Sequence, residues 1–192
     1  MWPGQPIRSG STARGGFQRG QCVEIIDFFH GGIVNAVDAK GRVSLPSSFR
    51  GVIDRRVRRH STDASSDDRL ILLGEHAKLP CLEGFDPTYS RQLHENIRLK
   101  VAAMEDVDVM EAMDDEMAEA FGSKSQIAYD SAGRMVLSAP MRRTAGITDT
   151  ALFIGGGETF QIWNPDEFRT ARADKPRLIR MLDSLLAERS AK

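Results

Sequence analysis

One motif occurs twice in the chain, and this repetition constrains the fold more than any other feature of the sequence. The motif is Asp-x-x-Gly-Arg followed by alternating apolar residues, at 38–42 and again at 130–134. Each copy then reaches a second apolar stretch, at 70–73 and 151–154, and a third that ends at Phe85 and Trp163. Three landmarks in the same order indicate that one β-rich unit has been duplicated.

The motif is predicted to form the turn of a hairpin within each copy. In the first copy it lies between the strand-like runs 33–37 and 42–45. Gly41 supplies the positive φ that such turns need. Arg42 follows Asp38 by four residues, close enough for an ion pair that fixes the direction of the guanidinium group. A fixed arginine at a hairpin tip suits phosphate or guanine recognition, although the ion pair alone is equally consistent with a role that only stabilises the hairpin.

Two further segments have helical periodicity and a polar segment has none. Apolar residues recur at spacings of three and four in 86–121 and in 174–192, which predicts helices that pack in a core or between subunits. The polar residues 55–68 lengthen the first copy relative to the second and are predicted to be a loop. The basic run at its start, 55–60, fits either contact with a DNA backbone or a solvated loop.

The net charge of -1 hides an uneven distribution of charged residues. Residues 1–60 contain ten Lys and Arg against four Asp and Glu, 61–130 contain six against sixteen, and 131–192 contain ten against seven. This pattern allows a confined basic face toward phosphates, although an ordinary solvated surface explains it equally well. Residues 1–26 lack a continuous hydrophobic region, so a flexible basic tail is expected rather than a secretory signal.

Several functional classes are disfavoured by the sequence. No apolar run approaches the roughly 20 residues of a membrane-spanning helix. Cys22 and Cys81 have neither metal-ligand nor redox spacing, so inert thiols in a reducing cytoplasm are expected. The sequence contains no cofactor motif and no recognisable nucleophile with its base. We therefore predict a protein that is not an enzyme, with no catalytic residue, metal site, cofactor or small-molecule substrate.

The repeated motif and its surroundings resemble the MraZ family. Residues 35–50 have the pattern Asn-x-x-Asp-x-Lys-Gly-Arg-x-x-x-Pro-x-x-Phe-Arg of its first half, and 145–147, 160–163 and 165–168 resemble its second half. Residues 29–32 resemble its amino terminus, so the similarity covers most of 29–173. The resemblance implies an α+β, β-rich fold, in which two SpoVT/AbrB-like units form a pseudo-twofold β-barrel flanked by α-helices.

The expected organisation follows the two copies. It consists of a tail (1–26), a first unit with its loop insertion (27–85), a helical connecting segment (86–121), a second unit (122–173) and a C-terminal helix (174–192).

The resemblance also implies a function and a set of DNA-binding residues. The implied protein is a sequence-specific transcriptional regulator of the bacterial division and cell-wall gene cluster, located in the cytoplasm at the nucleoid. It would bind short direct repeats in double-stranded promoter DNA as a ring-like homo-oligomer. The family's DNA-contacting motif falls on Asp38, Lys40, Arg42, Asp130 and Arg134.

One difference between the two copies and one alternative function remain open in the sequence. Ala132 occupies the place of Lys40 in the second copy, which leaves that tip with one cation fewer. AbrB-like units also occur in antitoxins, so the alternative is a module whose main partner is a protein. Two complete copies joined by a helical segment favour the regulator.

Overall fold

The computed structural model describes residues 27–60, 69–105 and 108–191. The predicted tail, Cys22 and the greater part of the predicted loop insertion (61–68) lie outside the described residues. Within the described part, the fold is α+β, as the resemblance implies, and all paired strands are antiparallel.

The strands and helices alternate in short groups along the chain. The strands are β1 (Gly32–Ala36), β2 (Arg42–Ser44), β3 (Leu70–Glu75), β4 (Leu82–Phe85), β5 (Lys124–Ala128), β6 (Arg134–Val136), β7 (Thr150–Gly155) and β8 (Phe160–Trp163). The helices are α1 (Ser47–His60), α2 (Tyr89–Ala102), α3 (Val109–Met117), the π-helical η1 (Ala118–Gly122), α4 (Ala139–Thr144), α5 (Pro165–Ala171) and α6 (Pro176–Ser190).

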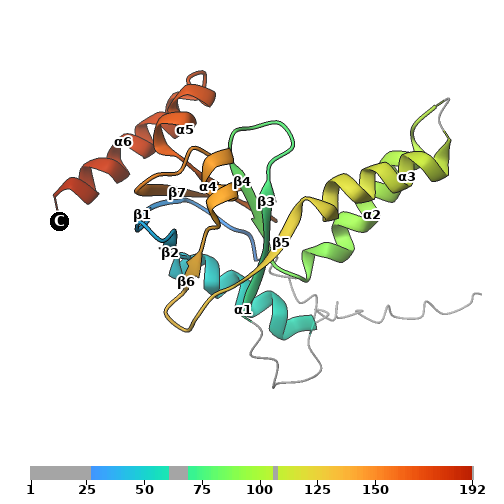
Figure 1. Ribbon diagram of the computed structural model, residues 1–192, viewed down its shortest axis with the longest axis horizontal. Coiled ribbons are helices and arrows are strands. Elements are labelled where there is room, and N and C mark those ends of the chain that lie inside the picture. The colour runs from blue at the N-terminus through green and yellow to red at the C-terminus, as the bar shows by residue number, and fades with distance from the viewer. Residues whose placement is uncertain (1–26, 61–68, 106–107, 192) are drawn as a thin grey trace, which may run out of the picture.

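The two sequence copies share one sheet rather than forming one sheet each. Six strands pair in the order β1-β7-β8-β4-β3-β5, every pair antiparallel (Figure 1). The first strand of each copy pairs with the other copy, β1 with β7 and β5 with β3. No ladder joins β1 to β5 among the described residues, and β2 and β6 form a separate two-stranded sheet. The expected closed barrel is therefore not confirmed.

The predicted hairpin pairing within each copy is wrong, because the strands on either side of the motif pair elsewhere. The turn itself is present, with the Gly41 N–H donating to the Asp38 carbonyl at 2.8 Å. After it, however, β2 pairs with β6 of the other copy, so that Val43 lies opposite Met135. Both of these side chains are buried. Pairing across the copies removes both from water, and this register keeps the arginine next to each on the exposed face.

Each face of the six-stranded sheet has its own apolar core. Alternate residues of a strand point to opposite faces. Phe153 of β7 therefore packs with Phe49 of α1, together with Phe29 and Phe160, in one cluster of aromatic rings. Its neighbour Leu152 belongs to a second cluster, whose other fully enclosed members come from β8, α5, α6 and the turn before β4: Cys81, Trp163, Phe168 and Leu182.

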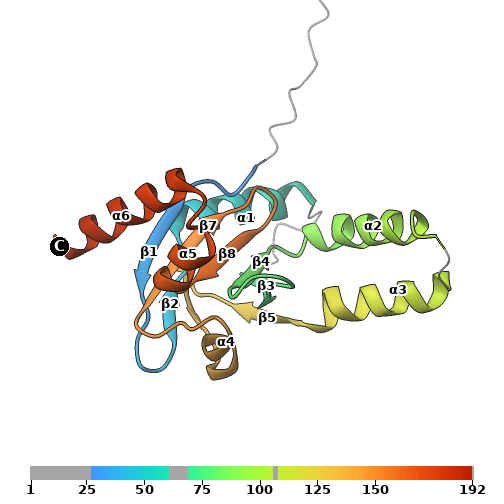
Figure 2. The ribbon, with the colours of Figure 1, turned by 90° about the horizontal axis from the view of Figure 1, so that it is seen from above.

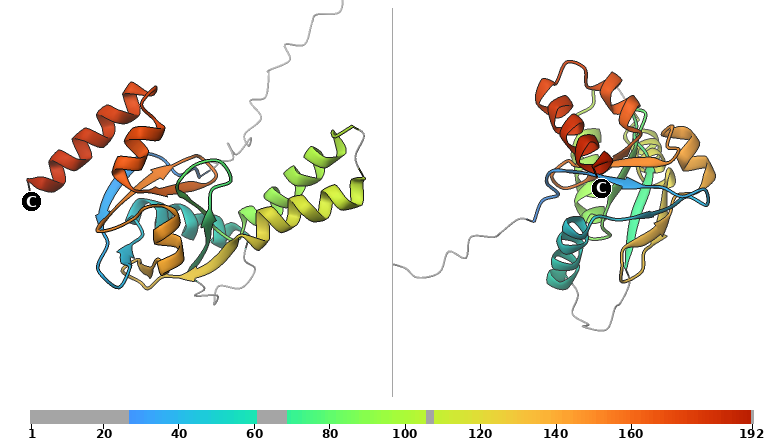
Figure 3. Two further views of the ribbon diagram at one scale, coloured as in Figure 1. Left: turned by 45° about the horizontal axis from the view of Figure 1, so that its top comes forward. Right: turned by 90° about the vertical axis from the view of Figure 1, so that its left-hand side faces the viewer.

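The segment 86–121, predicted to be helical, contains α2 and α3, and η1 follows α3 directly. α2 ends at Ala102 and α3 begins at Val109, and the two lie side by side (Figure 2). This pair and α6 extend from opposite sides of the sheet (Figures 1 and 3). No side chain of α3 is buried. None of the described helices has the length and apolar character that crossing a membrane requires.

Residues 55–60 are helical, so the predicted loop there is wrong. They form the last turns of α1, and Arg56 within them is buried. Arg56 Nη1 lies 2.7 Å from Asp86 Oδ2 and donates to the Glu158 carbonyl at 2.9 Å, while its Nε donates to the Asp27 carbonyl at 2.8 Å. The guanidinium group lies over the Phe29 ring, 4.9 Å from its centre. Arg56 thus ties α1 to segments of both copies.

Replacing Arg56 with Met is expected to lower the free energy of unfolding by about 3–5 kcal/mol, because the Asp86 carboxylate remains buried without its cation. Urea denaturation at one fixed protein concentration measures this loss. The double variant Arg56→Met/Asp86→Asn should be more stable than Arg56→Met alone, because it removes the unpaired charge.

Arg58→Met is the matched control, because Arg58 lies two residues away on the exposed side of α1. Its effect should stay within about 0.5 kcal/mol. Equal losses from Arg56→Met and Arg58→Met would contradict a structural role for the buried pair.

Candidate nucleic-acid interface

The first motif forms a turn held by a single carboxylate. Asp38 Oδ1 accepts the backbone N–H groups of Lys40 at 2.9 Å and Arg42 at 2.8 Å. Asp38 Oδ2 accepts from Arg42 Nε at 2.5 Å. The Arg42 side chain nevertheless remains 61% exposed. One carboxylate therefore fixes both the backbone of the turn and the direction of a solvent-facing guanidinium group.

The second motif repeats this arrangement. Asp130 Oδ1 accepts the N–H groups of Ala132 and Arg134, each at 2.9 Å, and Asp130 Oδ2 accepts from Arg134 Nε at 2.6 Å. The Arg134 side chain is 70% exposed. The predicted ion pair is thus confirmed in both copies. The two turns differ in that Ala132 stands where the first has the exposed Lys40.

Both carboxylates are held in their ionised form. The backbone N–H of Arg42, followed by its side chain, lowers the pKa of Asp38 below its ordinary value, and Arg134 lowers the pKa of Asp130 in the same way. A lowered pKa means that the interaction is complete above the ordinary value and is lost only as the pH falls through the lowered one. The geometry of both turns is therefore constant across neutral pH.

Each turn is also held against the other copy by a backbone hydrogen bond, at its own end of the β2–β6 ladder. The Leu137 N–H donates to the Gly41 carbonyl at 2.9 Å, and the Leu45 N–H donates to the Gly133 carbonyl at 2.8 Å. Gly41 has a φ of 81°, and a Cβ there would lie 2.3 Å from the Leu137 carbonyl oxygen. Glycine is therefore required by both the turn and the neighbouring copy.

Two arginines that the sequence analysis did not single out as site residues support the turns from beneath. Arg50 at the start of α1 donates from Nη1 to the Ser131 carbonyl of the second turn at 2.8 Å. Arg142 of α4 lies beside Gly41 of the first turn, with its Nε 3.0 Å from the position of an added Cβ. Each copy thus places an arginine under the turn of the other. The periodicity of the local sequence does not reveal a contact of this kind between residues of different copies.

The structure brings four of the five predicted site residues around one surface hollow of about 520 Å³. Lys40 is exposed at the first turn but does not line this hollow. The β2–β6 ladder forms one wall, and alternation along its strands exposes two side chains from each strand. These four are Arg42, Ser44, Arg134 and Val136. Sequence reasoning missed Ser44 and Val136, although each lies two residues after a motif arginine.

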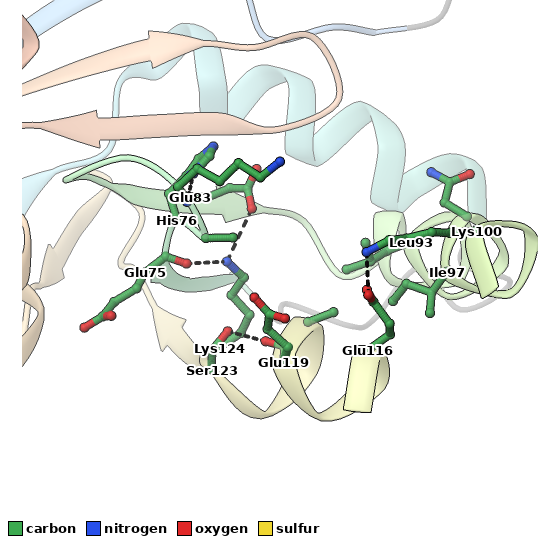
Figure 4. Close-up of a pocket in the computed structure, with 14 residues that line it drawn as sticks. Glu75, His76, Glu83, Leu93, Ile97, Lys100, Glu116, Glu119, Ser123 and Lys124 are labelled. Atoms are coloured by element: carbon green, nitrogen blue, oxygen red, sulfur yellow. Dashed lines mark hydrogen bonds and ion pairs between the residues drawn. The ribbon is translucent and has the colours of Figure 1, made fainter. Parts of the chain in front are cut away.

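A second hollow of about 710 Å³ lies between the β3–β4 turn and the α2–α3 pair (Figure 4). Two of its three lysines already have acidic or carbonyl partners, and four glutamates also line it. Lys124 Nζ lies 3.0 Å from the Glu75 carbonyl oxygen and 3.3 Å from Glu83 Oε2, and Lys100 contacts Glu116. This hollow is consequently a poor site for a phosphate backbone.

The metal-ligand residue types in the described part of the chain are dispersed, and its cysteine is buried. They include no cluster of three or more His, Cys, Asp or Glu side chains that could hold a metal ion. Burial raises the pKa of the Cys81 thiol to about 12, so this thiol is protonated at neutral pH.

Comparisons with known proteins find relatives in the family that the repeated motif resembles. Residues 120–177 match the family described as "MraZ protein, putative antitoxin-like". A protein named transcriptional regulator MraZ from Rhodospirillum rubrum is 32% identical over 157 residues, covering 82% of this chain and 92% of that protein. Proteins of the same name from Gluconobacter oxydans and Rickettsia bellii are 32% and 29% identical, covering 73% and 76% of this chain and 78% and 87% of their own lengths. Identity at this level over most of both chains shows that the protein belongs to the MraZ family.

Proposed function

We propose that the chain is a DNA-binding transcriptional regulator that reads promoter DNA with the exposed face of its β2–β6 ladder. The observation that carries the proposal is the pair of exposed arginines, each oriented by its own aspartate and both placed on one two-stranded ribbon. A two-stranded β-ribbon fits the major groove of B-DNA, where arginine hydrogen-bonds to guanine O6 and N7. The names of the curated relatives support the regulatory role.

Each predicted DNA-binding residue has a distinct part in this proposal. Arg42 and Arg134 contact bases, because their Nε atoms are held by aspartate and their terminal nitrogens have no other partner among the described residues. Asp38 and Asp130 are positioning residues and remain behind the arginines. Lys40 is an exposed point charge that suits a phosphate.

We further propose that the protein acts as a ring-like homo-oligomer on repeated promoter boxes of the division and cell-wall cluster, in the cytoplasm at the nucleoid. One ribbon neutralises few phosphates and binds a single box weakly. Several tethered ribbons that match the spacing of repeated boxes gain avidity without new contacts. Within this assembly the six-stranded sheet and the β2–β6 ladder together act as the barrel-like core expected of the family.

A protein-binding module is the second candidate, and the family description as antitoxin-like is what favours it. Two exposed, oriented arginines also suit acidic side chains of a protein partner. DNA titration separates the two candidates, because a pure protein-binding module has no salt-dependent affinity for promoter DNA.

Arg42→Ala is expected to reduce affinity for the chain's own upstream promoter region by about 5- to 150-fold per box, the value of one good arginine–guanine contact. Titrations over a range of salt concentrations, with oligomer size measured in parallel, test this expectation. A wild-type protein that binds no promoter DNA, or an intact Arg42→Ala oligomer with full affinity, would refute the proposed reading face.

Lys40→Ala should weaken binding to all sequences alike and reduce the salt dependence by about one unit of slope per engaged ribbon. Ala132→Lys is the matched reverse variant, because it gives the second turn the cation that the first already has. It should steepen the salt dependence by a similar amount. Unchanged slopes in both variants would contradict phosphate contact by the turns.

Asp38→Ala is expected to lower specific affinity toward that of Arg42→Ala, because the guanidinium group loses its fixed direction. Its affinity for unrelated DNA should be retained or raised, because a negative charge has been removed beside the phosphates. Competition between promoter and unrelated fragments measures this ratio. Equal losses on both fragments would indicate that Asp38 does not act by orienting Arg42.

Met110→Glu is expected to reduce oligomer size and, with it, affinity for repeated boxes. Met110 is 75% exposed and lies near the similarly exposed Leu99 and Val109 at the outer end of the α2–α3 pair. Such apolar side chains suit a contact between copies. Leu182, by contrast, is fully buried in the chain's own core, so its substitution tests folding rather than assembly.

Light scattering with and without DNA gives the oligomer size of the Met110 variant, and Glu111→Gln on the same helix is the control. A variant that loses assembly but keeps full affinity for repeated boxes would contradict the avidity argument.

A further inference from the structure

The exposed face of the β2–β6 ladder is not symmetric, although the ladder itself relates the two copies. Arg42 lies directly opposite Val136, and Ser44 lies directly opposite Arg134. When the two copies are superposed on each other, Arg42 therefore corresponds to Arg134, whereas Ser44 corresponds to Val136. The two ends of the ribbon present different chemistry.

Val136 is the unusual member of this set. Its side chain is 50% exposed, whereas Val43 and Met135, which point to the other side of the ladder, are 3% and 2% exposed. Of the large apolar residues that are well exposed in the described part of the chain, the other three lie on α2 and α3. Val136 is thus the one among them that stands beside an oriented arginine, on the wall of the hollow between the turns.

The chemistry of the major groove limits what an apolar side chain can recognise there. The C5-methyl group of thymine is the apolar feature on the base edges, whereas the other groups are hydrogen-bond donors and acceptors. Residues directly opposite each other on an antiparallel ladder have Cβ atoms about 5 Å apart. A valine opposite an arginine therefore reaches a base pair next to the one that the arginine contacts.

We propose that Val136 contacts the methyl group of a thymine adjacent to the base pair read by Arg42, and that Ser44 hydrogen-bonds to a base edge beside Arg134. This inference rests on the proposed function, because it assigns base contacts to the same ribbon. It assigns Val136 and Ser44 as specificity-determining residues. The ribbon then reads an asymmetric box in one direction.

The turns add to the same asymmetry. The turn that precedes Arg42 carries Lys40, whereas the turn that precedes Arg134 carries Ala132. The end of the ribbon with Arg42 and Val136 therefore has the additional cation. It binds its half of the box more tightly and in a methyl-dependent way, while the Ser44 end depends on hydrogen bonding.

A footprint of the wild-type protein on its promoter region first defines the box that it protects. Replacing each thymine of this box in turn by deoxyuridine, which lacks the methyl group, then tests the proposal with the full-length oligomer. One replacement should lower wild-type affinity by about fourfold per engaged ribbon, the value of one buried methyl group. The same replacement should have no effect on Val136→Ser, because that variant lacks the apolar contact. Thymines outside the protected box provide the internal control.

Ser44→Val is the matched variant at the other end of the ribbon. It should create sensitivity to a methyl group at the symmetry-related position of the box, or a preference for thymine there. Circular dichroism and oligomer size of Val136→Ser and Ser44→Val are the controls for folding and assembly, and both variants should match the wild type.

The results distinguish this inference from the function on which it rests. If the wild type binds no promoter DNA, the proposed function fails and the base assignment fails with it. If binding is tight and depends on Arg42, but no thymine replacement weakens it, or Val136→Ser keeps the full sensitivity, then the function stands and the role of Val136 is overturned.

Discussion

The short ladder between β2 and β6 is the contact on which the candidate site depends. It places the residues after both motif turns on one ribbon, so that Arg42 and Arg134 face the same side. The glycine of each motif makes this approach possible, because a Cβ at Gly41 or Gly133 would collide with a backbone carbonyl of the other copy. The repeated glycine therefore serves the pairing of the copies as much as the turn in which it lies.

The two kinds of ion pair in this structure have different consequences. The pairs of Asp38 with Arg42 and of Asp130 with Arg134 are exposed, and pairs screened by water in this way contribute little to stability. Their effect is to fix the direction of each arginine side chain while the guanidinium group stays accessible to a ligand. The pair of Arg56 with Asp86 is enclosed, and the same guanidinium group also reaches the Glu158 carbonyl of the second copy, so loss of Arg56 leaves a buried charge.

Local patterns in the sequence predicted the elements of the fold better than their partners. The apolar runs at 70–73 and 151–154 became β3 and β7, because a short continuous apolar run has the length of a strand and reflects burial at those positions. The exchange of strands between copies was missed, because register between distant strands leaves no local period. Residues 55–60 were misassigned for a related reason: their polarity hides a buried Arg56 whose partner, Asp86, is distant in the sequence. The site residues followed from the repeated motif, whereas Val136 required knowledge of which strand faces β2.

The presence of two copies in one chain explains why the proposed reading face is able to be asymmetric. In a dimer of identical single units, every residue on the ribbon appears twice, so the ribbon has twofold symmetry and suits a palindrome. In a duplicated chain each copy mutates independently, and the ladder here already pairs Arg42 with valine but Arg134 with serine. Ala132, in the place that Lys40 has in the first copy, extends the difference to the turns. A ribbon of this kind has a direction, and the proposed homo-oligomer would repeat that direction at every subunit, which would suit repeated boxes of one orientation better than inverted ones.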